Sequence, residues 1–351
     1  RDTERIADIV FSPQEDVQRG RHDGLKVGQK AAMPIPADTP AGDSLALLAI
    51  NRSLNGFMEW ETSDRMEHWN NVYVWKDGPN KGRVRSVQFF MFKTQEELPY
   101  EVQFLTAAEE ISFYSNANHF LLDLDTGEAI TKLVNLKRLT IGAYGLTSLH
   151  PDFKNLKNLE YLDLSSNNFQ TIPDILTPEN FPNLHAIVMN ACQRYTIYDL
   201  SNDDRENIAG LVDEPRFPER ILKWNALDTI RLSVNYLQGE LPSMSGHQKW
   251  TAEEVNACDT LPEILIGLPK VLPETEFFAI NYNRLTGELP DWLLYHPKLD
   301  IWYPYSLIFN QEGKNEEGVN AGFSNEPVNL DYYYEHYTNK KYNPNNRVEE
   351  Q

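Results

Sequence analysis

The segment from Leu159 to Phe169 constrains the fold more than any other stretch of the chain. Its leucines at 159, 162 and 164, asparagine at 167 and apolar residue at 169 follow the spacing L-x-x-L-x-L-x-x-N-x-L. The alternation of Leu162 and Leu164 predicts a short strand with one buried face. Asn167 follows where the chain turns, and its carboxamide can satisfy backbone groups there. Stacked copies of such a segment would form one parallel sheet.

The same spacing recurs along much of the chain. The copies are, in order, Val84–Phe89, Ala108–Asn116, Leu136–Leu146 with Tyr144 in the asparagine slot, Leu184–Cys192, Leu227–Leu237 and Phe278–Leu285, with Leu299 and Trp302 marking a last turn. The slots at 116, 144, 167, 192, 235 and 283 lie 28, 23, 25, 43 and 48 residues apart. Such repeats are ordinarily about 20 to 29 residues long, so insertions are expected at 193–226 and 244–274. The second insertion is expected to hold a short helix that starts near Thr251.

Composition narrows the classes of partner. With 41% hydrophobic residues among 351, the chain can bury a substantial core and is not disordered. Its 32 basic and 52 acidic residues give a net charge of −20, which argues against nucleic acid or an anionic membrane as the main partner. No apolar run of about 18 residues could span a membrane, so membrane attachment would need an anchor outside this chain. Cys192 and Cys258 are too few for a disulfide framework.

Two turn motifs carry a family resemblance. Leu237–Pro242 and Leu285–Pro290 each read L-x-G-x-L-P behind an asparagine slot, which resembles the turn of plant-type leucine-rich repeats. The stretch Asp43–Ile50, followed by Trp60, Trp69–Val72 and Arg83–Val84, is similar to the N-terminal cap of the same class. That cap normally carries paired cysteines, and their absence here separates the chain from plant receptor ectodomains.

The cysteine-free cap, the irregular repeats and the segment Leu307–Gly313 resemble the secreted or surface-anchored leucine-rich repeat proteins of gut Bacteroidetes. The resemblance implies an exported or lipid-anchored chain that works outside the cell or at its surface, with further domains in front. Residues 1–42, which contain Pro34, Pro36 and Pro40, are expected to be a linker or the tail of a preceding module.

The predicted fold is therefore an α/β leucine-rich repeat solenoid with a parallel sheet on its concave face and irregular or 3-10 turns on its convex face. We expect an N-terminal helical cap over 43–83, the solenoid over 84–305 and an irregular C-terminal cap or tail over 306–351. The tail holds the tyrosine-rich stretch 331–337, which is expected to cover the last turn. The competing interpretation of this stretch is an aromatic platform for sugar rings.

The resemblance and the repeat geometry predict a non-enzymatic module that binds a protein or peptide on its concave face. The positions between the leucines face outward there, and tyrosine and arginine are the residue types that most often carry interface energy. The predicted partner-binding residues are Arg138, Tyr161, Asp163, His185, Asn190, Arg231, Asn281 and Tyr282. The competing interpretation is that each is an ordinary solvated strand residue.

Residue patterns that would support catalysis or metal binding are sparse, and neither catalytic residues nor a cofactor or metal are predicted. Asp123–Glu128 resembles a calcium loop but has Val134 where the bidentate Glu belongs, so an acidic turn is expected. Cys192 occupies a slot that points into the solenoid and is expected to be a buried thiol. Two alternatives stay open. One is glycan binding or processing at the cell surface, with a carboxylate pair from Asp203, Asp204 or Glu206 and Glu253 or Glu254; the other is a structural spacer.

Overall fold

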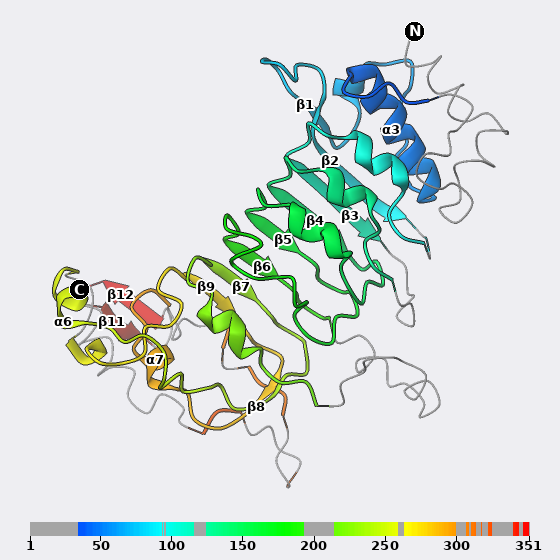
Figure 1. Ribbon diagram of the computed structural model, residues 1–351. Coiled ribbons are helices and arrows are strands. Elements are labelled where there is room, and N and C mark those ends of the chain that lie inside the picture. Colours follow the sequence, from blue (N-terminus) through cyan, green and yellow to red (C-terminus); the bar gives the residue numbers. More distant parts are fainter. Residues whose placement is uncertain are drawn as a thin grey trace. The chain divides into compact units, whose positions relative to one another are not determined.

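In the computed structural model the chain consists of two compact units (Figure 1). The first consists of residues 1–184 with 197–208, and the second of 185–196 with 209–351. The described residues are 34–92, 94, 96–115, 124–192, 214–258, 263–299, 307–308, 310–313, 317, 322–324 and the backbone of 340–343 and 347–350. Asn116, Asp123, Asp203, Asp204, Glu206, Trp302 and the tyrosine-rich stretch lie outside them.

The first unit is built on a sheet whose strands follow one another in sequence order. Its strands are β1 (Val72–Val74), β2 (Val84–Phe92), β3 (Glu110–Ser115), β4 (Arg138–Gly142) and β5 (Tyr161–Asp163). β1 runs antiparallel to β2, and the other neighbours are parallel. The pairing sets Ile111, Leu139 and Leu162 side by side, and all three are fully buried. The alternation of the repeat thus becomes one continuous apolar face, as predicted.

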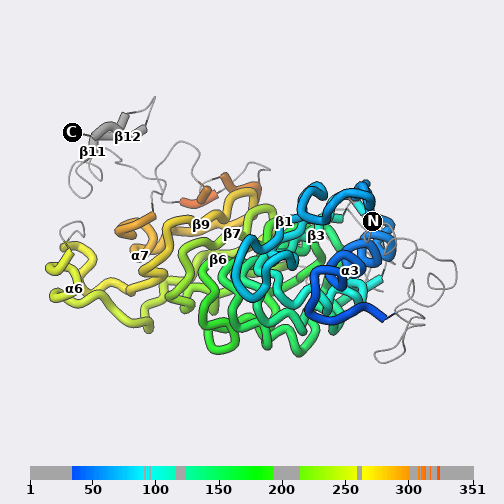
Figure 2. The backbone as a smooth tube through the Cα atoms, turned by 90° about the horizontal axis from the view of Figure 1, so that it is seen from above, coloured from blue at the N-terminus to red at the C-terminus, as the bar shows by residue number. Residues whose placement is uncertain are grey.

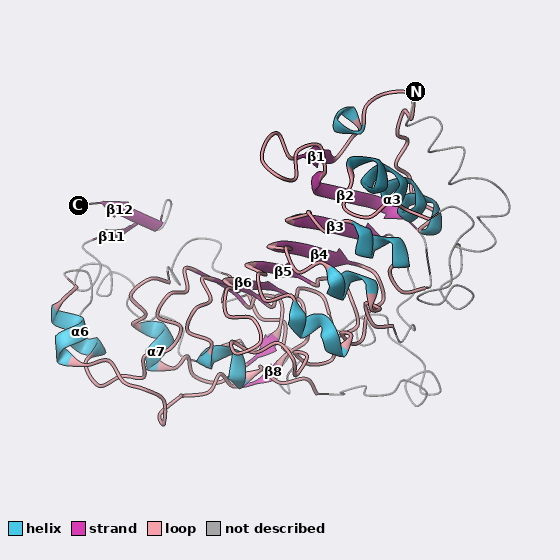
Figure 3. Cartoon of the chain, turned by 45° about the horizontal axis from the view of Figure 1, so that its top comes forward, coloured by secondary structure: helices cyan, strands magenta, loops and turns pink. Residues whose placement is uncertain are grey.

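Short 3-10 turns return the chain from one strand of the first unit to the next. They are η1 (Met66–His68), η2 (Tyr100–Phe104), η3 (Ala129–Lys132) and η4 (Pro151–Asn155). Figure 3 shows these turns in cyan beside the magenta strands, and η2, η3 and η4 contact one another in succession. Each contributes a buried apolar residue to the core, such as Val102, Ile130 or Phe153. The predicted fold class is confirmed.

The N-terminal cap of the first unit is a helix, α3 (Pro40–Ser53), that covers the start of the sheet. Thr39 caps it by accepting a hydrogen bond from Gly42 N at 2.9 Å, and proline at the first helical position has no N–H to leave unpaired. The helix begins three residues before 43, so Thr39 and Pro40 belong to the cap rather than to a linker. Further along the cap, Trp60 and Trp69 stack with ring centroids 5.2 Å apart.

The second unit carries two small parallel sheets. The first holds β6 (Ala186–Val188), β7 (Thr229–Arg231) and β9 (Phe277–Ala279), and the second holds β8 (Gln238–Gly239) and β10 (Arg284–Leu285). Figure 2 shows β6, β7 and β9 in successive turns of the chain. The helical segments of this unit are η5 (Glu219–Lys223), α6 (Ala252–Asn256), η6 (Glu263–Leu265) and α7 (Asp291–Leu294). Near the end of the chain, β11 (Lys340–Asn343) pairs antiparallel with β12 (Arg347–Glu350). The second sheet is made by the two L-x-G-x-L-P turns.

Asparagine side chains tie successive turns together in both units, as the sequence predicts. In the first unit, the Asn167 Oδ1 accepts hydrogen bonds from the amides of Tyr144, Gly145 and Leu146 at 3.0 to 3.1 Å. In the second unit, Asn283 accepts from the Asn235 and Leu237 amides and donates to two carbonyls. These buried carboxamides satisfy backbone groups that a turn leaves unpaired.

Gln311 fills the same role one turn further on, which the sequence analysis missed. Its Oε1 accepts from Leu285 N at 3.1 Å, and its Nε2 donates to the carbonyls of Ile280 and Ile308 at 3.0 and 2.7 Å. The amide of Ile280 also donates to Leu307 O at 2.7 Å. Residues 307–308 and 310–313 therefore contribute to a further repeat turn, beyond the boundary at 305 that the sequence predicted. The longer glutamine side chain hid this turn from a template that requires asparagine.

The second insertion contains the predicted short helix. Thr251 caps α6, since its side chain accepts from Glu254 N at 3.1 Å while Glu254 reaches back to Thr251. Cys192 is buried, as expected from its slot, and its amide donates to Asn235 Oδ1 at 2.7 Å. Cys258 is exposed.

The glycine of the L-x-G-x-L-P turn is expected to be required for its backbone conformation. Gly239 has a φ of 83°, a region that side-chain-bearing residues rarely adopt, and a Cβ there would collide with the Arg216 side chain. Gly239→Ala is expected to lower the free energy of unfolding by about 1 to 2 kcal/mol. Gly246→Ala is the matched control, because its Cβ would point into open space. Urea denaturation of both variants tests this, and equal stabilities would contradict it.

His296 is expected to make the second unit sensitive to acid. Its Nε2 donates to the carbonyls of Val271 and Leu272 at 3.0 Å, while its Nδ1 accepts from the amides of Lys298 and Leu299. Burial lowers the pKa of His296 from 6.5 to about 4. The folded state therefore prefers the neutral ring, so this stability is fully present above pH 6.5 and is lost as the pH falls toward 4.

The expected loss is about 3 kcal/mol between pH 6.5 and 4, from 1.36 kcal/mol per pKa unit. Denaturation curves at stepped pH would measure it. His296→Asn should flatten this part of the pH dependence, whereas His185→Asn, at an exposed histidine whose Nδ1 lies against the Ala226 carbonyl, should leave it unchanged. An unaltered slope in His296→Asn would refute the assignment.

Candidate functional site

The outward positions of the sheet line up in columns, and this alignment places the predicted partner-binding residues. In the first unit, Glu110, Arg138 and Tyr161 are register partners on β3, β4 and β5. The next outward column on these strands holds Ser112, Thr140 and Asp163. The register thus sets the positions between the leucines side by side on adjacent strands.

Arg138 and Tyr161 form one pair on the first unit. The Arg138 guanidinium carbon lies 4.2 Å from the centroid of the Tyr161 ring, a cation–π distance, and its Nε lies 3.7 Å from a Glu110 carboxylate oxygen. Asp163 is partly committed to its own turn, because its Oδ1 accepts from Ser165 N at 2.9 Å. The structure thus brings three of the predicted residues together on adjacent strands.

A second pair of the same kind lies on the second unit. The Arg231 guanidinium carbon lies 5.8 Å from the Phe277 ring centroid, and Phe277 is 51% exposed. The register partners of Arg231 are Val188 and Ala279, and both are buried. These two positions were expected to face outward, and they do not offer side chains to a partner. Phe277 was not among the predicted partner-binding residues.

Asn190 and Asn281 hold the ends of the strands. Asn190 Oδ1 accepts from Ser233 N at 2.9 Å, and Ser233 Oγ donates to Asn281 Oδ1 at 2.5 Å. These contacts order the strand ends and occupy part of each carboxamide. His185 is exposed, and its Nδ1 lies 3.3 Å from Ala226 O.

Tyr282 lies at a position where the backbone repeatedly turns left-handed. Residues 143, 166, 191, 234 and 282 all have φ values between 52° and 61°. Tyr282 is 46% exposed there, while Arg284 lies over the neighbouring Tyr236 at 4.2 Å. The sequence predicted Tyr282 as an outward-facing residue, but it did not reveal the left-handed turn at this position.

Sequence reasoning missed one exposed aromatic residue and left another out of the predicted set. Phe90 on β2 is 39% exposed, and its register partner Tyr114 on β3 is 46% exposed. The signal was available, because Phe90 is two residues after Gln88 and faces the side opposite the buried Val87 and Phe89. The β2 copy of the repeat was too degenerate for this alternation to be followed to its end.

The described residues offer little for catalysis or metal binding. Asp125 Oδ1 accepts from Gly127 N at 2.6 Å, which is an acidic turn of the expected kind. Burial, and then the charge of Asp125, raises the pKa of Glu97 beside it. Within the described ranges, no three histidine, cysteine or acidic side chains gather to hold a metal ion. No helix in the same ranges is long and apolar enough to cross a membrane.

Of the carboxylates considered for glycan hydrolysis, Glu254 is committed to local structure. It forms an ion pair with Lys270 at 2.5 Å and closes the capping box of α6. The hydrogen bond from Lys270 lowers the pKa of Glu254, which disfavours a role as general acid.

Comparison with known proteins agrees with the repeat geometry. A family model described as Leucine Rich Repeat matches residues 158–184. The fold is a leucine-rich repeat. Receptor-like protein 39 of Arabidopsis thaliana is 24% identical to this chain, in a match that covers 58% of this chain and 32% of that protein. The chain thus spans about a third of the length of the curated relative that it matches.

Three solved structures of plant and bacterial proteins are similar to parts of this chain. A plant ice-binding protein is 22% identical, covering 74% of this chain and 83% of its own, with a TM-score of 0.40. The ectodomain of the Arabidopsis thaliana receptor kinase GASSHO1/SCHENGEN3 is 17% identical, covering 66% of this chain and 25% of its own, with a TM-score of 0.38. InlP of Listeria monocytogenes is 18% identical, covering 60% and 47%, with a TM-score of 0.33.

Proposed function

We propose that this chain is a non-enzymatic module that binds a protein or peptide through the outward face of its strands. We place it in the extracellular space or at a bacterial cell surface, like the secreted and surface-anchored leucine-rich repeat proteins of gut Bacteroidetes. The observation that carries the proposal is the arginine held over an aromatic ring in each unit, Arg138 over Tyr161 and Arg231 over Phe277. The remaining predicted residues, Asp163, His185, Asn190, Asn281 and Tyr282, would form the surrounding polar contacts.

Such pairs suit recognition for a physical reason. Arginine and tyrosine dominate the energy of protein interfaces, because each buries a large apolar area and retains directed hydrogen-bond donors. A guanidinium already held over a ring loses less conformational freedom when a partner docks. A repeat sheet supports these side chains on a rigid backbone, so the partner meets an ordered surface.

The test is capture of extracellular and cell-surface proteins on the immobilised full chain, followed by affinity measurement with each purified protein captured. Arg138→Ala, Tyr161→Ala and Arg231→Ala are each expected to weaken a true partner by about tenfold or more. Arg65→Ala and Phe57→Ala are the controls, since both residues are exposed but lie outside the strands. They should bind as the unchanged chain does.

A partner that all three strand variants bind equally well would place recognition elsewhere. Failure to retain any protein would favour the structural spacer. Surface labelling of intact producing cells with an antibody to this chain tests the proposed location separately.

A further inference from the structure

An aromatic shelf lies on the outward face of the first unit, next to the residues of the proposed protein site but distinct from them. Phe90, Tyr114 and Gly142 are register partners on β2, β3 and β4. A Cβ built on Gly142 would lie 2.9 and 3.0 Å from two carbons of the Tyr114 ring. The ring therefore leans across β4 and occupies the space that a side chain at 142 would fill. Gly142 is buried as a result, while Tyr114 stays 46% exposed.

A polar row runs beside this shelf; it is uncharged on β2, β3 and β4, and on β5 it continues to Asp163, the register partner of Thr140. Gln88, Ser112 and Thr140 are register partners two residues earlier on the same three strands, and all are half-buried. They present one amide and two hydroxyl groups, and none carries a charge. The nearest charged column on β3 and β4 pairs internally, because Arg138 Nε lies 3.7 Å from Glu110.

We propose that this sugar shelf, defined as Phe90, Tyr114 and Gly142 with the row Gln88, Ser112 and Thr140, binds a neutral oligosaccharide. The axial C–H face of a pyranose ring is apolar and packs on exposed aromatic rings. Its hydroxyl groups both donate and accept hydrogen bonds, which matches the amide and hydroxyl groups of the row. The glycine leaves the approach to the Tyr114 ring unobstructed from β4.

The row holds no cation, and its β5 end is the acidic Asp163, so it selects against anionic ligands. A carboxylated or sulfated sugar would give up hydration of its charge without gaining a cationic partner in the row, which costs free energy. The binding is expected to vary little with salt, because no ion pair contributes to it. This inference does not depend on the proposed protein binding, since the two sets of residues do not overlap.

The test uses the full chain and a defined panel of neutral hexasaccharides: malto-, cello-, laminari-, manno- and xylohexaose. Binding is measured by isothermal titration calorimetry and by saturation-transfer NMR of the sugar protons. We expect at least one of these sugars to bind, and Phe90→Ala or Tyr114→Ala to weaken it by about tenfold. Tyr114→Phe should retain most of the affinity if the ring face is the contact.

Two matched variants separate this site from other surfaces and from misfolding. Phe277→Ala removes an aromatic ring of comparable exposure in the second unit and should leave sugar binding unchanged. Thr140→Val keeps the side-chain shape but removes the hydroxyl of the row and should weaken binding by severalfold. Unchanged far-UV circular dichroism confirms that each variant is folded.

Each remaining outcome overturns the proposal. These are no binding of any panel sugar at 5 mM (about −3 kcal/mol), equal binding by the Phe90 and Tyr114 variants, or preference for sialylated or sulfated oligosaccharides tested alongside. If Phe90→Ala or Tyr114→Ala loses sugar binding and keeps protein binding, the result concerns the sugar shelf alone. If Arg138→Ala loses protein binding and keeps sugar binding, the result concerns the proposed function alone.

Discussion

Asn167→Leu is expected to lower the free energy of unfolding of the first unit by about 4 kcal/mol or more. The Asn167 side chain is fully buried, and its Oδ1 accepts from three consecutive amides. Its Nδ2 donates to the carbonyls of Ile141 and Leu164 at 2.7 and 2.9 Å. Leucine has a similar volume but no polar atoms, so these groups would stay buried without their partner. Two such groups at roughly 2 kcal/mol each already give this loss.

Chemical denaturation followed by circular dichroism measures the effect, and hydrogen exchange localises it. Exchange at the amides of Tyr144, Gly145 and Leu146 should accelerate most. Asn167→Asp keeps the acceptor but loses both donors, so an intermediate stability is expected. Asn158 is the control, because it is exposed and donates a single hydrogen bond, to Val134 O at 2.8 Å. If Asn167→Leu and Asn158→Leu lose similar stability, the asparagine contacts do not hold the turns together.

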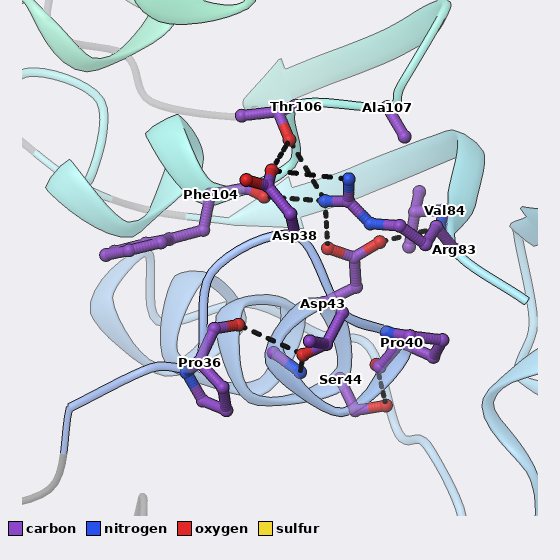
Figure 4. A network of polar contacts seen from close by, with 12 residues as sticks. Pro36, Asp38, Pro40, Asp43, Ser44, Arg83, Val84, Phe104, Thr106 and Ala107 are labelled. Atoms are coloured by element: carbon purple, nitrogen blue, oxygen red, sulfur yellow. Dashed lines mark hydrogen bonds and ion pairs between the residues drawn. The ribbon is translucent and has the colours of Figure 1, made fainter. Parts of the chain in front are cut away.

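Arg83→Met is expected to detach the N-terminal cap, at a cost of about 3 to 5 kcal/mol. Asp43 on α3 is 1% exposed, and its Oδ1 accepts from Arg83 Nη2 at 3.0 Å while its Oδ2 accepts from Val84 N at 2.8 Å. The same guanidinium donates to the Thr106 hydroxyl, which in turn donates to Asp38 (Figure 4). Removing Arg83 would leave a buried, unpaired carboxylate between the helix and the sheet.

The pKa of Asp43 shows why breaking this pair costs more than replacing it. Burial raises this pKa even though Arg83 and the Val84 amide act to lower it. The charged form is thus still penalised, and an apolar pair of similar volume can recover stability. Asp43→Leu with Arg83→Met is therefore expected to be more stable than Arg83→Met alone.

Thermal unfolding and limited proteolysis of the cap measure these differences in a double-mutant cycle. The exposed pair Arg65–Glu67, 3.2 Å apart, supplies the control, and Arg65→Met should change stability by less than about 1 kcal/mol. If Arg83→Met leaves the cap as protected as in the unchanged chain, the pair does not lock it. The Arg83–Asp43 ion pair joins the cap helix to the sheet. The cap contains no cysteine and therefore no disulfide.

The repeat predicted the interior better than the surface. Leu139, Leu162 and Asn167 lie where their spacing placed them, because a repeat position fixes both the strand alternation and the turn that follows. Val188 and Ala279 share an outward column with Arg231, yet both are buried. A repeat position predicts on which face of a strand a side chain lies, but not whether neighbouring residues bury it. The exposure of the candidate site residues therefore had to come from the structure.

The sequence by itself determined the strand positions, the asparagine slots, the capped helix near Thr251 and the two glycine turns. Each of these depends on residues within one turn of the chain, where local backbone geometry and apolar periodicity decide the outcome. Tertiary structure alone decided that Gln311 serves as a further slot, that Arg83 pairs with Asp43 and that the Tyr114 ring covers Gly142. These contacts join residues from different turns, and which side chains meet there depends on strand register and packing, which a single repeat does not specify.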